Sequence, residues 1–187
     1  EMASAFAPEN LLREARRQKR IEGTRVPAAC VLDPDGDLVR QLERDGRTRL
    51  DPDWPCYHTD LHHFRDGGLD IGIVGRAVGA PFAVLVAEQL FASGCELLIS
   101  MTSAGQLVDL APPPYFVLID KALRDEGTSY HYLPPMEYSV VNANLLDAMS
   151  GAFAALRVSV KQGATWTTDA PFRETEAAIA AMKARHN

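Results

Sequence analysis

The sequence has few cysteines and no long apolar run, and each shortage excludes a class of protein. Its three cysteines, Cys30, Cys56 and Cys95, are odd in number and follow no disulfide or paired-ligand spacing, which predicts a reducing, cytoplasmic location. No apolar stretch approaches the roughly 20 residues that span a bilayer. The first residues also lack the charged start and apolar core of a signal peptide. We therefore expect a protein without a membrane partner.

Basic residues are also in short supply. Nineteen Lys and Arg stand against 25 Asp and Glu, so the formal charge is -6. Such a balance argues against a nucleic-acid surface, which needs clustered cations. The basic run Arg13–Arg20 also contains Glu14 and Gln18 and lies on a helical pattern, which favours a solvated helix face. With 187 residues, 47% of them hydrophobic, the chain can bury the core of a globular domain.

Several catalytic and metal-binding motifs are missing. The sequence has no HExxH, paired CxxC, Walker-type loop or GxSxG elbow. Cys56, His58, Asp60 and His62 alternate, so on a strand they would share one face, and all are metal-ligand types. Four neighbours on one strand do not readily converge on one ion, which favours polar surface or a subunit interface and predicts no metal. A metal-dependent enzyme using His58, Asp60, His62 and His63 stays open as a weaker alternative.

Helical and strand patterns alternate along the chain. Helices are expected at Pro8–Glu22, Leu38–Arg44, Phe82–Ala92, Asn144–Leu156 and Glu174–Arg185. Strands are expected at Val26–Leu32, Cys95–Met101, Tyr115–Leu123 and Val158–Thr165, and a hairpin pairs Cys56–Phe64 with Leu69–Val74. Loops are expected at Arg47–Pro55 and Arg124–Tyr138. The apolar run Cys95–Met101 is typical of a strand buried on both faces. This order predicts an α/β domain with a mostly parallel sheet covered on both faces.

Three loops at the carboxyl ends of expected strands are candidate ligand sites: Gly75–Pro81, Thr102–Gln106 and Thr167–Arg173. The first could bind an anion at a helix N-terminus or could be a plain tight turn. In the third, Phe172 could stack on a planar ring while Arg173 donates hydrogen bonds to its edge. The same loop could be a capped helix start, with Thr168 or Asp169 as the cap and Glu174 in the first turn. Both interpretations can hold together.

Longer motifs resemble one family. The run Gly75–Leu107, which ends in the turn Ser103-Ala104-Gly105, resembles the nucleoside phosphorylase superfamily, and within it the uridine phosphorylases. Leu123–Tyr138 is similar to the segment that these enzymes carry after the same strand. Gly163–Thr175 is similar to their base-binding region. The resemblance covers roughly residues 26–187 and leaves residues 1–25 as an N-terminal helical arm, either mobile or clasping a partner subunit.

The resemblance implies a three-layer α/β/α sandwich with a mixed, mostly parallel central sheet, assembled as dimers or hexamers. It also implies cleavage of a ribosyl N-glycosidic bond by a pentosyltransferase or a related nucleosidase. A nucleoside or nucleobase is the expected partner, with no organic cofactor and with phosphate as a possible co-substrate. Carried over residue by residue, Ser103, Ala104 and Gly105 would line the floor under base and sugar. Thr167, Phe172 and Arg173 would face the base.

The residues that bind phosphate in that family are replaced in this chain. Its strand before the glycine turn usually ends in a phosphate-holding arginine, where this chain has Ser100, and the following glycine is Thr102. The family's Gly-Asp-Pro turn with a nearby arginine is replaced by Asp33–Leu38, in which Pro34 donates no amide and Leu38 offers no charge. Charged hydrogen bonds contribute about 1.5–3 kcal/mol each, so losing two arginines should weaken phosphate binding more than tenfold. The Ser-Ala-Gly turn resembles that of the hydrolytic nucleosidases.

The family binds the ribose hydroxyls with a Met-Glu-x-Glu segment that follows the last expected helix. The printed sequence stops at Asn187, before such a segment, so residues 26–187 are expected to lack the family's C-terminal part. A protein without it would have an open ribose site. The alternative function is therefore a catalytically silent nucleoside-binding protein or oligomer subunit that retains the fold.

Overall fold

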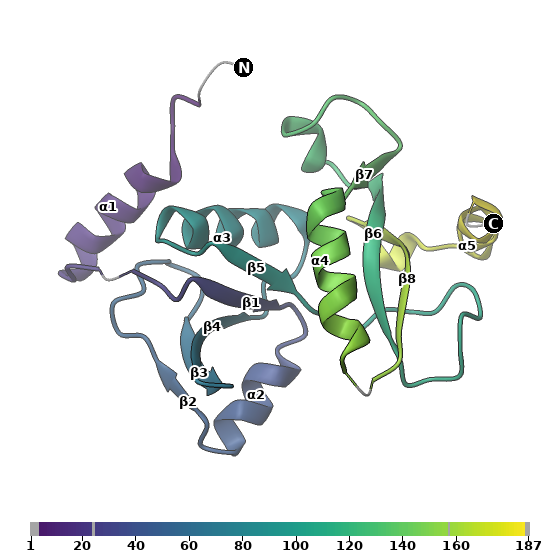
Figure 1. Cartoon of the computed structure of the whole chain (residues 1–187). Helices are drawn as coiled ribbons and strands as arrows, with labels where there is room; N and C mark the ends of the chain where they lie inside the picture. Colours follow the sequence, from purple (N-terminus) through teal and green to yellow (C-terminus); the bar gives the residue numbers. More distant parts are fainter. Residues whose placement is uncertain (1–3, 24, 157, 186–187) are drawn as a thin grey trace. The chain divides into compact units, whose positions relative to one another are not determined.

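The computed structural model describes residues 4–23, 25–156 and 158–185. These residues form two compact units, one up to Ser103 and the other from Ala104 on. Each unit combines strands with helices, and each has its own sheet (Figure 1). We describe the two units separately.

The first unit is built on a five-stranded mixed sheet in the order β2-β3-β4-β1-β5. The central strand β1 runs parallel to both β4 and β5, while β2, β3 and β4 form an antiparallel meander. The strand bounds are β1 Ala29–Asp33, β2 Thr48–Leu50, β3 His62–Asp66, β4 Leu69–Gly75 and β5 Leu97–Ser100. The carboxyl ends of β1, β4 and β5 therefore meet at one edge of this sheet.

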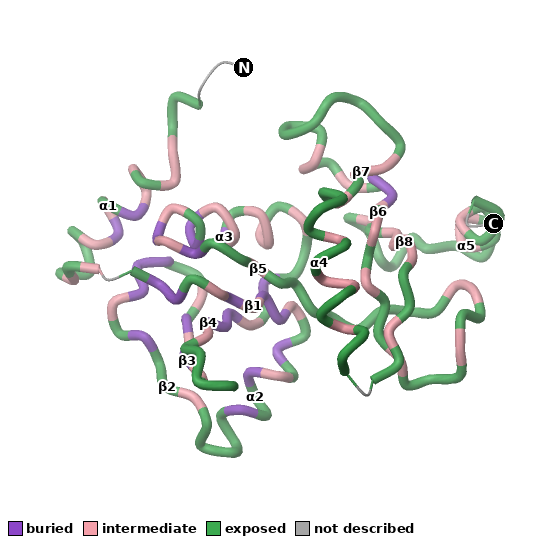
Figure 2. The backbone as a smooth tube through the Cα atoms, viewed as in Figure 1, coloured by how far each residue is buried: buried purple, intermediate pink, exposed green. Residues whose placement is uncertain are grey.

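Three helices accompany this sheet: α1 Pro8–Lys19, α2 Asp37–Arg44 and α3 Ala80–Ala92. Helix α1 buries Leu12 and Ala15 and packs against α3. Most of the buried side chains of the protein lie in this unit (Figure 2). Its two apolar clusters contain Val26, Cys30, Leu32, Trp54, Cys56, Leu61, Val74, Ala77, Val86, Leu90 and Cys95 in the first, and Val39, Leu42 and Ile73 in the second.

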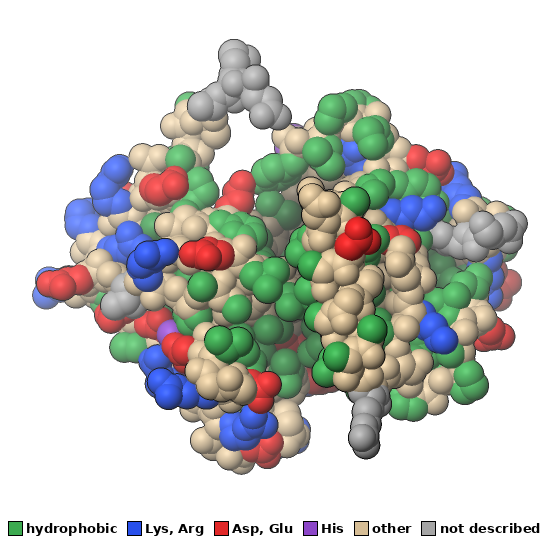
Figure 3. Space-filling view, in the orientation of Figure 1, with side chains coloured by type: hydrophobic (Ala, Val, Ile, Leu, Met, Phe, Trp, Pro, Cys, Tyr) green, Lys and Arg blue, Asp and Glu red, His purple; other side chains and the backbone are tan. Residues whose placement is uncertain are grey.

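The second unit is built on a three-stranded sheet in the order β7-β6-β8, in which β6 is parallel to β8 and antiparallel to β7. Its elements are β6 Phe116–Asp125, β7 Tyr138–Val140, α4 Ala143–Ala154, β8 Val160–Thr168 and α5 Glu176–Arg185, with short 3-10 turns η1 Ser129–His131 and η2 Pro171–Arg173. Among its described residues only Leu123 and Arg124 are buried (Figure 2). Apolar side chains are correspondingly common on its surface, as the space-filling view illustrates (Figure 3).

The α/β class with mixed strand directions is confirmed. The helices expected around residues 8–22, 38–44, 82–92, 144–156 and 174–185 all form, with ends shifted by up to three residues. The hairpin also forms, because Gly67 and Gly68 both take the positive φ values that its turn requires. In the part of the chain that the structure describes, no helix is long and apolar enough to cross a membrane.

Three expectations about strands are wrong. β3 begins at His62, so residues 56–61 are not part of it, and the expected loop Arg47–Pro55 contains the short strand β2. The strand expected to be buried on both faces, β5, lies at an edge of its sheet. Leu97 and Ile99, which share one face of β5, are 36% and 38% exposed, whereas Leu98 on the other face packs against the apolar core. An apolar run alone does not distinguish a central strand from an edge strand.

Candidate functional site

The carboxyl edge of the first sheet is organised by two aspartates, Asp33 at the end of β1 and Asp35 in the turn that follows. The buried carboxylate of Asp33 accepts the amide N–H of Gly36 at 3.1 Å and that of Val39 at 2.9 Å. These amides lie at the start of α2, where backbone donors would otherwise be free to hold an anion. The chain therefore supplies its own carboxylate to the N-terminus of α2.

Asp35 likewise accepts a backbone N–H, here from the turn after β5. Its Oδ2 atom accepts the backbone N–H of Ser103 at 2.6 Å. This hydrogen bond is the largest cause that holds the pKa of Asp35 below its ordinary value. The hydroxyls of Ser103 and Thr102 and the charge of Arg40 act in the same direction and together outweigh the effect of burial. The N–H of Ser103 at the start of the Ser-Ala-Gly turn is thus already bonded to the Asp35 carboxylate, which is ionised at neutral pH.

The glycine-containing loop after β4 adds one cation to this edge. Arg76 has a left-handed φ of 67° and its N–H donates to the Asp33 carbonyl at 2.9 Å. Its side chain packs against Gly36, where an added Cβ would lie 2.9 Å from Cγ of Arg76. Helix α3 starts after Gly79, and no described side chain caps it. The anion-binding hypothesis for this loop stays a prediction.

In the second unit, the parallel strands β6 and β8 end side by side, with Asp125 opposite Thr168 in the register. The loop after β6 is held by the buried guanidinium of Arg124. It donates to Ser129 Oγ at 2.8 Å and to the carbonyls of Pro134 and Leu133 at 2.6 and 3.2 Å. It also lies 4.2 Å from the ring centroid of Tyr130. Arg124 therefore fixes the shape of this loop from inside.

Glu126 stabilises the start of the same loop. Burial raises the pKa of its carboxyl, but hydrogen bonds from Ser129 and from the amide of Thr128, with the charge of Arg124, lower it below its ordinary value. Its Oε2 atom accepts the N–H groups of Thr128 at 2.7 Å and Ser129 at 2.9 Å. Apart from the polar composition of the segment, no sequence pattern indicates these roles of Arg124 and Glu126.

The three predicted base-facing residues lie close together in the chain and are all exposed. Thr167 is the penultimate residue of β8, and Phe172 and Arg173 form the turn η2. The side chain of Phe172 is fully exposed. A free aromatic face next to a guanidinium is suited to a planar, polar ring.

The predicted capping of the last helix is wrong in position. Helix α5 begins at Glu176, and Thr175 Oγ1 accepts the N–H of Ala178 at 3.2 Å. Thr168 instead accepts the N–H of Ala170, and Asp169 accepts the N–H of Gly127 at 2.8 Å. The sequence contains a suitable N-cap residue, the threonine immediately before the first helical residue, six positions after Asp169.

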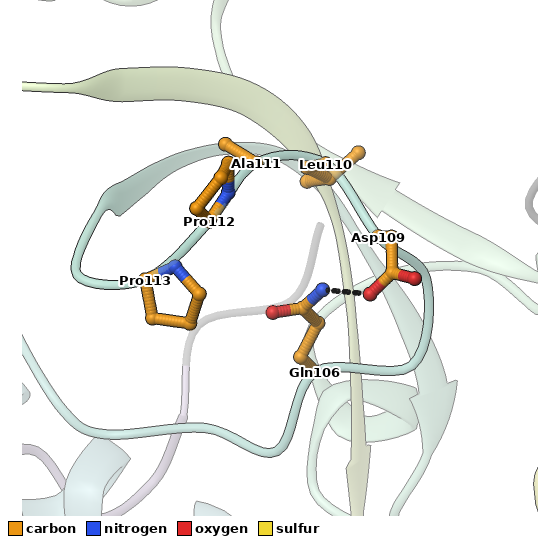
Figure 4. Close-up of a pocket in the computed structure, with 6 residues that line it drawn as sticks. All are labelled: Gln106, Asp109, Leu110, Ala111, Pro112 and Pro113. Carbon is orange, nitrogen blue, oxygen red and sulfur yellow. Dashed lines mark hydrogen bonds between the residues drawn. The ribbon is translucent and has the colours of Figure 1, made fainter.

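The predicted turn Ser103-Ala104-Gly105 directly follows β5 and is exposed. Next to it in sequence, residues 106–113 curve around a hollow of about 690 Å³ (Figure 4). Gln106 bonds Asp109 across this curve at 2.6 Å, and Leu110 to Pro113 complete the lining. One segment alone forms this hollow, and its described lining includes none of the predicted site residues.

The shared strand face considered for Cys56, His58, Asp60 and His62 does not form, because β3 begins only at His62. His58 and Asp60 are exposed in the loop before β3, whereas Cys56 is buried in the core. Among the described residues, no three His, Cys, Asp or Glu side chains are grouped so that they could hold a metal ion. The structure therefore does not bring together the side chains on which the metal-dependent alternative was based.

His63 has a different environment from its neighbours. Its side chain is buried in β3, and its Nε2 and Nδ1 atoms lie 3.0 Å from Asp51 and from Asp70 respectively. Asp51 is also buried, and its second oxygen accepts the N–H of Asp53 at 2.8 Å. Arg49 lies 3.7 Å from Asp70 at the exposed end. The cluster therefore links β2, β3 and β4 by side chains.

The sequence model of the phosphorylase superfamily matches residues 27–186. The chain belongs to this superfamily. No curated protein matches it. The matched range includes both sheets and every predicted site residue.

Solved structures with the same fold come from several members of the superfamily. Uridine phosphorylase from Vibrio fischeri matches with a TM-score of 0.71 and 20% identity, over 86% of this chain and 67% of its own. Purine nucleoside phosphorylase from Toxoplasma gondii, in complex with immucillin-H, matches with a TM-score of 0.69 and 14% identity, over 85% and 65% of the two chains. Helicobacter pylori MTAN matches with a TM-score of 0.62 and 14% identity, over 83% and 73%. The chain thus spans about two thirds of the length of the two phosphorylases.

Proposed function

We propose that this protein cleaves the ribosyl N-glycosidic bond of a nucleoside and that water, not phosphate, accepts the ribosyl group. Membership of the phosphorylase superfamily supports the first part of this proposal, that an N-glycosidic bond is cleaved. The structural relatives include two phosphorylases and a futalosine hydrolase from Helicobacter pylori, so both kinds of acceptor occur among similar folds. The identity of the acceptor must therefore be argued from this chain's own residues.

The observation that carries the proposal is the contact between Asp35 and the amide of Ser103. A phosphate ion needs cationic or N–H donors to replace its hydration. Here the amide of Ser103 already donates to an ionised carboxylate, and Ser100 brings no charge to the end of β5. A second anion beside Asp35 would be repelled, whereas neutral water would not. The aspartates at this edge thus favour hydrolysis.

For the base, we assign contacts to the exposed residues at the end of β8. Phe172 offers a free aromatic face, and Arg173 offers donors to a carbonyl oxygen of the base. When the bond between C1′ and the base nitrogen breaks, its electron pair moves onto the base. A guanidinium bonded to the ring's oxygen stabilises that charge. Water then supplies the oxygen for C1′ and the proton for the base. The roles of Ser103, Ala104, Gly105 and Thr167 remain the predictions given above.

Base release with and without phosphate tests this proposal. We expect uridine, inosine or methylthioadenosine to yield free base and free ribosyl sugar at a rate that 50 mM phosphate changes by less than about twofold, because Asp35 keeps the anion out. Free base and sugar are measured by chromatography. Release that requires phosphate and yields a sugar 1-phosphate would contradict hydrolysis.

No base release from any of the three nucleosides would contradict the enzymatic function. The catalytically silent alternative would then be supported if these nucleosides raise the melting temperature of the protein without being cleaved. Inosine and uridine carry different ring systems, so the same assay also shows which kind of base the protein accepts.

A further inference from the structure

Two loops of the second unit leave from neighbouring parallel strands, one after β6 and one after β8 (Figure 1). The first, residues 126–137, is held internally by Arg124 and Glu126, as described above. The second, residues 169–175, carries Phe172 and Arg173. The hydrogen bonds within this loop are few and short in range: the N–H of Ala170 donates to Thr168, and those of Arg173, Glu174 and Thr175 donate to residues two or three positions before them. The second loop is therefore the less restrained of the two.

Two side-chain hydrogen bonds join these strand ends. The N–H of Gly127 donates to Asp169 Oδ2 at 2.8 Å, across 42 residues of sequence. The Nε1–H of Trp166 donates to Asp125 Oδ2 at 2.9 Å, across 41 residues. The Asp169 bond is the one that reaches from loop to loop, because Trp166 and Asp125 still lie within their strands. An ionised acceptor makes it a charge-assisted hydrogen bond.

We propose that Asp169 is a positioning residue that fastens the turn bearing Phe172 and Arg173 to the loop held by Arg124. This inference rests on the proposed function, because it assigns Phe172 and Arg173 to the nucleobase. A binding side chain that is already held in place loses less conformational freedom when the ligand binds. The hydrogen bond from Gly127 to Asp169 thus restrains the turn with Phe172 and Arg173 by joining it to the loop that Arg124 holds. Asp169 itself does not touch the base in this proposal.

Matched substitutions test the proposal. Asp169→Ala removes the acceptor, whereas Asp169→Asn keeps one amide oxygen in its place. Asp109→Ala is the control, since its carboxylate bonds Gln106 within the separate segment 106–113. We expect the amide hydrogen of Gly127 to exchange with solvent at least about tenfold faster in Asp169→Ala, less so in Asp169→Asn, and at the wild-type rate in Asp109→Ala.

The second readout is the dissociation constant of the free bases uracil, hypoxanthine and adenine, which needs no turnover. For the base that the wild-type protein binds, we expect at least about fivefold weaker binding in Asp169→Ala and near-normal binding in Asp169→Asn, with unchanged melting temperatures. A purely structural role would not be rescued by asparagine at constant stability.

The outcomes separate this inference from the proposed function. If the Gly127 amide exchanges at the wild-type rate in Asp169→Ala, the proposed link between the two loops is overturned. If exchange is faster but the affinity for the base is unchanged, the positioning role of Asp169 is overturned. Wild-type protein that binds none of the three bases overturns that role as well. If Asp169→Ala alters both exchange and base affinity while the wild-type protein releases no base from nucleosides, the inference holds and the catalytic proposal fails.

Discussion

Replacing His63 by alanine is expected to lower the free energy of unfolding by about 3 kcal/mol. The ring of His63 lies between Asp51 and Asp70, with 3.0 Å from a ring nitrogen to each carboxylate. Without it, the buried Oδ2 atom of Asp51 loses its partner in a place that water reaches poorly, and a small void remains. Chemical denaturation followed by circular dichroism measures the change.

His62→Ala is the matched control for this prediction. His62 is in the same strand, and its ring nitrogen lies 3.7 Å from Glu43, a carboxylate that is 45% exposed. Because Glu43 can be hydrated when His62 is replaced, losing this contact should cost about 1 kcal/mol, less than the loss of His63. The double variant His63→Ala, Asp51→Ala should be more stable than the sum of the two single changes predicts, because the unpaired carboxylate is gone. Strict additivity within about 0.5 kcal/mol would show that the His63–Asp51 contact is energetically unimportant.

Exchanging the acidic edge for a cationic one is expected to create phosphate binding. The double variant Asp35→Gly, Ser100→Arg frees the amide of Ser103 and places a guanidinium at the end of β5. With about 1.5–3 kcal/mol per charged hydrogen bond, the affinity for inorganic phosphate should rise by about 10- to 100-fold. Isothermal titration with inorganic phosphate measures this affinity, and the base-release assay shows whether turnover then responds to phosphate.

The charge of Asp35, and with it the repulsion of phosphate, should depend on pH in a defined direction. Because the pKa of Asp35 is lowered in the folded protein, its contact with Ser103 is present above the ordinary carboxyl pKa. The contact is lost only as the pH falls through the lowered folded value. At neutral pH the wild-type protein therefore presents a full negative charge to phosphate, and the single change Asp35→Gly removes it.

Asp37→Asn is the control for charge alone. Asp37 lies in the same segment and pairs with Arg40, but it does not contact Ser103. This variant should leave phosphate binding within about twofold of wild type. If Asp37→Asn raised phosphate affinity as much as Asp35→Gly, net charge rather than occupation of the amide would control the acceptor.

The elements that sequence patterns predicted well are those with local causes. The hairpin follows from two glycines at the turn, and α3 ends where Ser93 and Gly94 interrupt an apolar pattern. Helix α4 forms where Asn142 provides a side-chain cap for Asn144 and Leu145. These signals lie within a few residues of the structure that they specify, so one sequence is enough to recognise them.

The errors concern properties that depend on distant partners. Whether β5 is central or at an edge depends on what pairs with its second side, and no residue within Leu97–Ser100 encodes that. The histidines near residue 60 were grouped by alternation, but strand β3 begins only at His62, which leaves His58 and Asp60 in a loop. Periodicity does not show where a strand begins when the preceding loop is also polar.

The same distinction applies to the candidate site. Composition and family resemblance were enough to select the turn after β5 and the segment after β8. The contacts that give these segments their character, Asp35 with Ser103 and Asp169 with Gly127, join residues 68 and 42 positions apart. Only the folded arrangement brings such pairs together, and no spacing rule reaches that far.

The burial of all three thiols makes the protein well suited to site-specific labelling. Cys30, Cys56 and Cys95 lie in the core of the first unit, and burial raises the pKa of the Cys30 thiol to about 12. Native cysteines protected in this way react slowly with maleimides, because the thiolate is the reactive species. A single cysteine introduced at the exposed Ala170, two residues before Phe172, can therefore carry a fluorophore while Phe172 and Arg173 are kept, and that fluorophore would respond to a ligand that binds at the turn.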